Sequence, residues 1–188
     1  MESGLERKYN FEIVRWFTVM AVIYLVVGAA VGVYIASELA WASLNFDSPY
    51  LSFGRLRPVH TNAVIFAFGG CALMATAFYS VQRTCGVRLW SDKMAWFTFW
   101  GWNTVIVLAV ITLPLGFSQA KEYAELEWPV DILIAVVWLS FTINFIMTLA
   151  TRKSSHIYVS NWFFLGMMVM IVYLHVVNSL AIPVGMFK

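Results

Sequence analysis

Long stretches without a charged residue constrain this chain more than any other feature of its sequence. An α-helix needs about 20 predominantly apolar residues to cross the hydrocarbon core of a bilayer. Five stretches reach that length: residues 16–37, 58–82, 94–120, 132–151 and 157–187. They predict helices near 14–37, 59–82, 94–115, 130–150 and 158–181. The expected fold class is therefore all-α: a polytopic membrane protein whose five transmembrane helices form a single domain, 1–188.

The charge content supports a location in the lipid bilayer and argues against a role with nucleic acids. Only 12% of the residues are charged, which is about half of the share found in ordinary soluble domains. The formal net charge is +2, too small for the basic surface that nucleic-acid binding requires. We therefore expect lipid, and no nucleic acid, among the partners of the chain.

The distribution of lysine and arginine predicts the direction of the helices. If the N-terminus is cytoplasmic, eight of these residues lie on the cytoplasmic side and four lie outside. Because basic residues accumulate on the cytoplasmic side of membrane proteins, we expect a cytoplasmic N-terminus and an external C-terminus. The first span is expected to remain as an anchor, because its apolar core is too long for a cleaved signal peptide and acidic residues precede it.

A histidine marks the external start of the second span. His60 lies at the entrance to the membrane, and Arg57 precedes it by three residues. An ionisable residue at this depth is costly unless it has a partner or a function. An imidazole can bind haem iron while a guanidinium pairs with a propionate, so the pattern is compatible with a haem site. A structural histidine bonded to a neighbouring helix explains it as well, and the residues alone leave both interpretations open.

Four segments of the chain together resemble one family of membrane enzymes. The segments are RPVHTNAVIFAFGG, WPVDILIAVVW, YVSNWFF and LHVVNSLAIPV. In this order they are similar to the catalytic subunit of the C-family haem–copper oxidases, the cbb3-type cytochrome c oxidases. The resemblance implies that His60 is an axial ligand of a low-spin haem b near the external membrane surface. It also implies that Arg57 stabilises a haem propionate, with Arg55 as a second candidate for that role.

Three glutamates, Glu122, Glu125 and Glu127, lie just ahead of the fourth span in the expected external loop. Carboxylate oxygens are preferred ligands of calcium, yet from the sequence alone a solvated acidic loop is the better interpretation. The family resemblance implies a calcium site near the haem propionates. On that basis Glu122 is the first expected ligand and Glu125 the second, through a direct or an indirect contact. Glu127 is expected to be a loop charge only.

A second membrane histidine, His175, lies inside the fifth span with Asn178 one helical turn away. The preferred interpretation is a neutral imidazole that hydrogen-bonds to the backbone of a neighbouring helix or to Asn178. The alternative is a role at the haem, either supporting its surroundings or as an axial ligand opposite His60.

The family resemblance implies a place in a respiratory complex of the bacterial cytoplasmic (inner) membrane. Electrons would come from membrane-anchored mono-haem and di-haem c-type cytochrome subunits and pass through haem b to a high-spin haem and copper. Oxygen would be reduced there, with coupled proton translocation. Because this chain has only three histidines, the high-spin haem and copper are expected only with the remaining segment of the catalytic subunit. Two alternatives stay open: a stand-alone membrane cytochrome b with His60 and His175 as ligands, and a haem-free assembly or scaffold protein.

Overall fold

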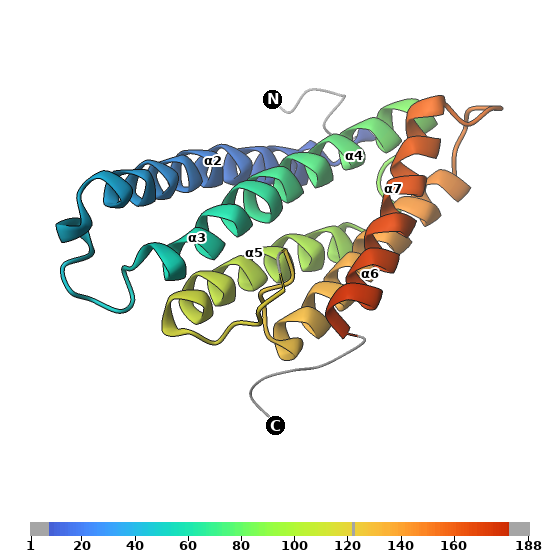
Figure 1. Ribbon diagram of the computed structural model, residues 1–188. Helices are drawn as coiled ribbons and strands as arrows, with labels where there is room; N and C mark the ends of the chain where they lie inside the picture. The colour runs from blue at the N-terminus through green and yellow to red at the C-terminus, as the bar shows by residue number, and fades with distance from the viewer. Residues whose placement is uncertain (1–7, 122, 181–188) are drawn as a thin grey trace.

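The computed structural model describes residues 8–121 and 123–180, which form a bundle of long helices (Figure 1). The elements are α2 (Phe11–Ala40), η1 (Ala42–Asn45), α3 (Phe53–Asn62), η2 (Ala63–Gly69), α4 (Gly70–Cys85), α5 (Asp92–Leu115), α6 (Trp128–Ala150), α7 (Val159–His175) and η3 (Val176–Leu180). Elements α3, η2 and α4 follow one another without a break and form the second span. In the described residues, five helices are long and apolar enough to cross a membrane. The all-α class and the five predicted transmembrane helices are thereby confirmed.

The largest difference from the predicted helix bounds occurs at the start of the second span. The helix begins at Phe53 rather than near residue 59, and Pro58 lies inside it. A hydropathy pattern locates the apolar core of a span, whereas a helix can continue past that core into the headgroup region. Here Arg55 and Arg57 occupy such an extension. The helix therefore carries both arginines and His60 on one rigid element.

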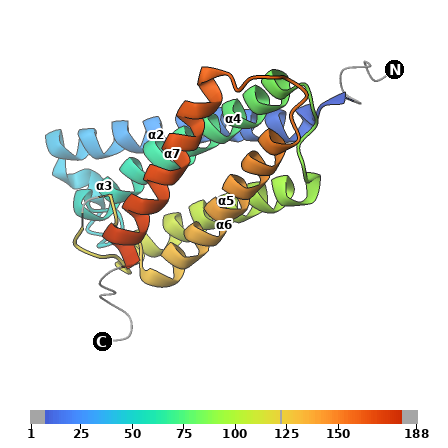
Figure 2. The ribbon, with the colours of Figure 1, turned by 90° about the vertical axis from the view of Figure 1, so that its right-hand side faces the viewer.

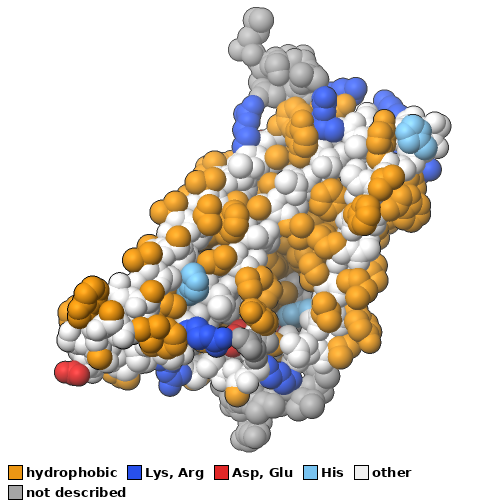
Figure 3. Space-filling model, turned by 45° about the horizontal axis from the view of Figure 1, so that its top comes forward, with side chains coloured by type: hydrophobic (Ala, Val, Ile, Leu, Met, Phe, Trp, Pro, Cys, Tyr) orange, Lys and Arg blue, Asp and Glu red, His pale blue; other side chains and the backbone are white. Residues whose placement is uncertain are grey.

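The antiparallel helices place their polar segments at two ends of the bundle. The N-side end, as we call it, contains the start of α2, the end of α4 and the loops α4–α5 and α6–α7. The C-side end contains the start of α3 and the loop α5–α6. In Figure 3, lysine and arginine side chains gather toward both ends, and hydrophobic side chains cover the surface between them. This banding fits a membrane-spanning bundle; which end is cytoplasmic stays a prediction.

The helices pack through aromatic contacts in the interior. Helix α2 lies along α3, η2 and α4, α5 pairs with α6, and α7 contacts α6 and α4 (Figures 1 and 2). Phe17 of α2 meets Phe99 of α5 edge to face, with ring centroids 5.1 Å apart. Phe78 of α4 and Phe141 of α6 make the same contact at 5.1 Å. Because lipid tails are as apolar as these side chains, close packing of this kind is what favours helix association in a membrane.

Two buried amide side chains fasten helix starts at the N-side end. Gln82 accepts a hydrogen bond from the backbone N–H of Asn10 at 2.7 Å and donates one to the Asn10 carbonyl oxygen at 3.3 Å. Asn144 bonds to both backbone groups of Ser91, each at 3.0 Å. Asn10 and Ser91 are the N-cap residues of α2 and α5. Each amide therefore ties one helix to the start of another through backbone groups.

Candidate functional site

The imidazole of His60 lies against α2 at two positions that have no side chain. Its Nδ1 is 2.8 Å from the carbonyl oxygen of Gly28. Gly32, one turn further along α2, faces the same ring, and a Cβ added there would lie 2.6 Å from the imidazole Cε1. Cβ atoms essentially never approach other atoms so closely. The ring can therefore rest on α2 because residue 32 is glycine.

The contact with Gly28 determines which nitrogen of His60 carries the proton. A carbonyl oxygen only accepts hydrogen bonds, so Nδ1 is the donor, and in a neutral imidazole Nε2 then keeps its lone pair. Nε2 has no hydrogen-bond partner among residues 8–121 and 123–180. Histidines that bind metals commonly donate their other ring N–H to a backbone carbonyl, which sets the tautomer and the ring orientation. The contact thus selects the tautomer of His60 in which Nε2 can accept a bond.

The two arginines before His60 differ in their relation to it. Arg57 is exposed and lies one helical turn before His60, so both side chains leave α3 on the same face. Arg55 lies five residues before His60 and points elsewhere. Its guanidinium packs against Gly116, the left-handed residue that ends α5. Of the two, only Arg57 shares a face of the helix with the imidazole.

The residues directly after α3 form a π-helix, η2. Such segments are rare, contain a wider turn than an α-helix and occur frequently at functional sites. Helix α5 supports the segment, because Nε1 of Trp102 donates a hydrogen bond to the carbonyl oxygen of Phe66 at 3.2 Å. Because of this wider turn, the side chains that follow the segment point in other directions than they would in a regular α-helix.

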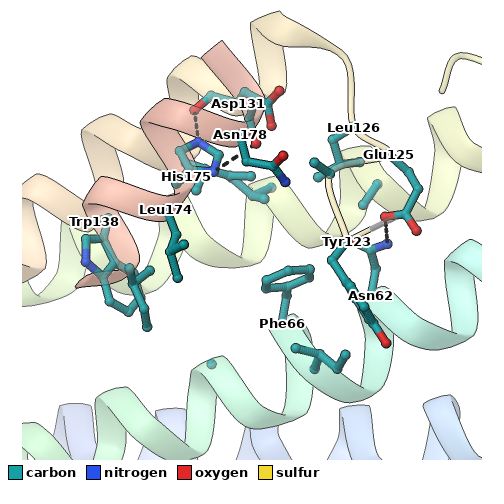
Figure 4. Close-up of a pocket in the computed structure, with 18 of the residues that line it drawn as sticks. Asn62, Phe66, Tyr123, Glu125, Leu126, Asp131, Trp138, Leu174, His175 and Asn178 are labelled. Carbon is teal, nitrogen blue, oxygen red and sulfur yellow. Dashed lines mark hydrogen bonds between the residues drawn. The ribbon is translucent and has the colours of Figure 1, made fainter. Parts of the chain in front are cut away.

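A cavity of about 840 Å³ lies on the other side of the second span, between that span, α5, α6 and α7. Its walls are mainly apolar and include the rings of Phe66, Trp102 and Trp138. Its polar lining is grouped toward the C-side end. Figure 4 shows Asn62 and Glu125 on one side and Asp131, His175 and Asn178 on the other. The cavity is thus an apolar space with a polar C-side end.

His175 lines this cavity, and both of its ring nitrogens have partners. Nε2 lies 2.9 Å from the backbone carbonyl oxygen of Asp131 and must donate to it (Figure 4). Nδ1 is then the acceptor, and the hydroxyl of Ser179 lies 3.5 Å away. This geometry favours the structural interpretation of His175, in which the imidazole bonds to the backbone of a neighbouring helix.

The structure does not bring the two membrane histidines to one cavity. His60 contacts α2, which contributes no residue to the lining of the cavity, and His60 itself is not among the lining residues. His175 faces the cavity from α7. Nothing in this arrangement favours a haem held between His60 and His175.

The acidic loop is less exposed than a solvated loop would be. Glu122 lies outside the described residues. Glu125 is buried, and its carboxylate accepts a hydrogen bond from Nδ2 of Asn62 at 3.3 Å. Glu127, expected to be a loop charge, is also buried, with an exposed fraction of 5%. Among the described residues no group of three histidine, cysteine or acidic side chains is arranged to hold a metal ion, so the calcium site stays a prediction.

Several residues of this region have a role that the sequence reasoning missed. Gly28 and Gly32 stand four residues apart in an apolar helix, a spacing typical of close helix contacts; that spacing could have identified them. Asn62 joins the second span to the acidic loop, and Asp131 offers its backbone to His175. No sequence signal separates these two from other polar residues near membrane ends.

The sequence is similar to those of known oxidase subunits. Residues 12–188 match the family described as cytochrome c and quinol oxidase polypeptide I. The chain is 58% identical over 188 residues to the Cbb3-type cytochrome c oxidase subunit CcoN1 of Stutzerimonas stutzeri; the matched region is 100% of this chain and 40% of that protein. It is 52% identical over 183 residues to cytochrome c oxidase subunit 1 of Rhodobacter capsulatus; the matched region is 96% of this chain and 34% of that protein. A cytochrome c oxidase subunit 1 homolog of Agrobacterium tumefaciens is 50% identical over 178 residues, covering 95% of this chain and 33% of that protein. The chain therefore spans 40% or less of the length of these relatives. The resemblance drawn from the four sequence segments is confirmed.

Proposed function

The chain belongs to the cytochrome c and quinol oxidase polypeptide I family, and on that premise we propose that it forms the N-terminal membrane part of the catalytic subunit of a cbb3-type cytochrome c oxidase. Within it, His60 is an axial ligand of a low-spin haem b. The observation that carries the proposal is the bond between Nδ1 of His60 and the Gly28 carbonyl, which leaves the lone pair of Nε2 without a partner in the part of the chain that the structure describes.

The residues of this chain perform three tasks at such a site. Gly28 holds the imidazole in one tautomer and one orientation. Gly32 leaves the space in which the ring rests. Arg57, one turn away, offers a guanidinium to a propionate. Bound iron porphyrin supplies reversible one-electron chemistry, so the part of this chain in the reaction is electron transfer.

The remaining steps belong to the larger assembly. We assign oxygen reduction, on a high-spin haem and copper, to the remaining segment of the catalytic subunit, and electron delivery to mono-haem and di-haem c-type cytochrome subunits. Proton translocation is a property of the whole complex, in a bacterial inner membrane with the N-terminus of this chain cytoplasmic. Glu122 and Glu125 are proposed calcium ligands. The contact between Glu125 and Asn62 supports this, because it holds that carboxylate beside the second span.

A difference spectrum of the reduced and oxidised protein tests the proposal. The chain is produced with the remaining segment of the subunit and its partner subunits, and haem b is measured in the wild type, His60→Ala and His175→Ala. We expect His60→Ala to lose the low-spin signal. We expect His175→Ala to retain it, because both ring nitrogens of His175 are engaged by protein groups.

Other outcomes contradict the proposal in distinguishable ways. Equal loss of the signal in both variants would support the stand-alone cytochrome with two histidine ligands. A wild-type complex without haem b would support the scaffold. Full haem content in His60→Ala would remove His60 from the site altogether.

A further inference from the structure

A second site lies at the N-side end, at the opposite end of the bundle from Arg55 and Arg57. A groove of about 380 Å³ runs between the start of α2 and the end of α4. Its lining residues are Phe11, Val14, Arg15, Tyr79 and Arg83. The reaction proposed above uses none of them.

Two guanidinium groups border this groove at the level of the membrane surface. Arg15 directly precedes the uncharged stretch of the first span, and Arg83 directly follows that of the second. Both are exposed. A third cation stands close by, because Arg83 and Lys8 lie over the ring of Tyr9, at 5.4 Å and 5.2 Å from its centroid. Glu12 lies one turn from Arg15 but does not line the groove. The groove is therefore bordered by basic side chains where hydrocarbon gives way to headgroups.

Aromatic side chains form the wall between the charges. The rings of Phe11 and Tyr79 stack with centroids 5.9 Å apart. Tyr79 is 46% exposed, and among the described residues its hydroxyl has no hydrogen-bond partner. Aromatic rings with a polar end are typical of the membrane–water interface. The wall thus offers an apolar ring surface and a hydrogen-bond donor beside two arginines.

An apolar strip continues from the groove toward the middle of the membrane. Val22 and Leu25 follow Phe11 and Arg15 at helical spacing on α2, and both are exposed. Only 17% of the most apolar part of α2 is buried in the bundle. A molecule with an anionic head in the groove would find a hydrocarbon-compatible surface directly below it.

We propose that this groove binds an anionic phospholipid, such as phosphatidylglycerol or cardiolipin. Arg15, Arg83 and the Tyr79 hydroxyl contact its phosphate, and its acyl chains lie along the outer face of α2. Basic pockets between transmembrane helices bind lipid headgroups of this kind. The continuous apolar strip selects a lipid over a soluble phosphate, because a free anion gains nothing from that surface.

The test measures the phospholipid that stays bound to the isolated complex. The wild type, Arg15→Gln/Arg83→Gln and the control Lys153→Gln are purified in mild detergent, and bound lipids are identified by native mass spectrometry. Lys153 is an exposed cation of the same end that does not line the groove. Titration of phosphatidylglycerol against phosphatidylcholine, with and without inorganic phosphate, then gives the selectivity.

We expect the double variant to bind phosphatidylglycerol about thirtyfold more weakly, the effect of two basic side chains near a membrane surface. Lys153→Gln should bind as the wild type does, and Arg15→Lys/Arg83→Lys should recover most of the affinity. Equal loss in Lys153→Gln would mean general attraction to the basic end and overturn the proposal. So would equal retention of phosphatidylcholine, or displacement of the lipid by inorganic phosphate.

Discussion

Replacing Gly32 by alanine is expected to weaken haem binding by the oxidase about 10–100-fold, because that is the usual loss of affinity when a group that orients a metal ligand is disturbed. The added methyl group would lie 2.6 Å from Cε1 and 2.9 Å from Nδ1 of His60. The imidazole must then move away from α2, which breaks its bond to the Gly28 carbonyl and removes the constraint on Nε2. The measurement is the haem b content per complex, from the difference spectrum of the reduced and oxidised protein.

A matched control separates this effect from a general intolerance of α-helical glycine replacement. A Cβ at Gly166, in α7, meets no atom within 4 Å. Gly166→Ala should therefore keep the full haem content. If Gly32→Ala keeps it as well, His60 does not hold the haem in the orientation described here, and the proposed ligand geometry is wrong.

Replacing Gln82 by leucine is expected to destabilise the bundle by about 2–4 kcal/mol. Gln82 is fully buried and Asn10 is only 4% exposed. The variant removes the bonds from Gln82 to both backbone groups of Asn10, and it leaves the N–H of Asn10 buried without its partner. A lowering of the midpoint of thermal unfolding by about 5–10 °C corresponds to such a loss.

The stability measurement uses the purified protein in one detergent, followed by circular dichroism. Thr104→Val serves as the control, because the exposed Thr104 hydroxyl bonds only to the carbonyl of Trp100 in its own helix, at 2.9 Å. Its midpoint should stay close to that of the wild type. An unchanged midpoint in Gln82→Leu would show that the start of α2 does not depend on this amide.

The transmembrane architecture was predictable because apolar length alone selects helices in a membrane. The fourth span illustrates this. Trp128 and Pro129 indicate a helix start, and α6 begins at Trp128 with proline in its first turn. The early start of α3 at Phe53 was not predictable in this way, because Arg55 and Arg57 interrupt the additional turns and place them outside the uncharged stretch.

The candidate site was predictable only in part. His60 was identified from its position and its family resemblance, but the orientation of its ring depends on a carbonyl 32 residues earlier in the chain. The burial of Glu125 and Glu127 likewise depends on how the loop packs against other elements. From the sequence, a charged side chain is expected to be exposed to water. The burial of these two carboxylates instead results from the packing of the loop against other elements.

The π-helical segment η2 sets the angular phase of the second span. Each residue of an α-helix rotates the chain by about 100°, and a π turn contains one additional residue. Deleting a single residue from 63–69 would therefore turn α4 by about 100° relative to α3. Either His60 would leave α2, or Phe78 and Gln82 would leave the interior of the bundle. The additional residue therefore lets one continuous span place His60 against α2 and also keep Phe78 and Gln82 in the interior. A regular helix of the same span could satisfy only one of these two requirements.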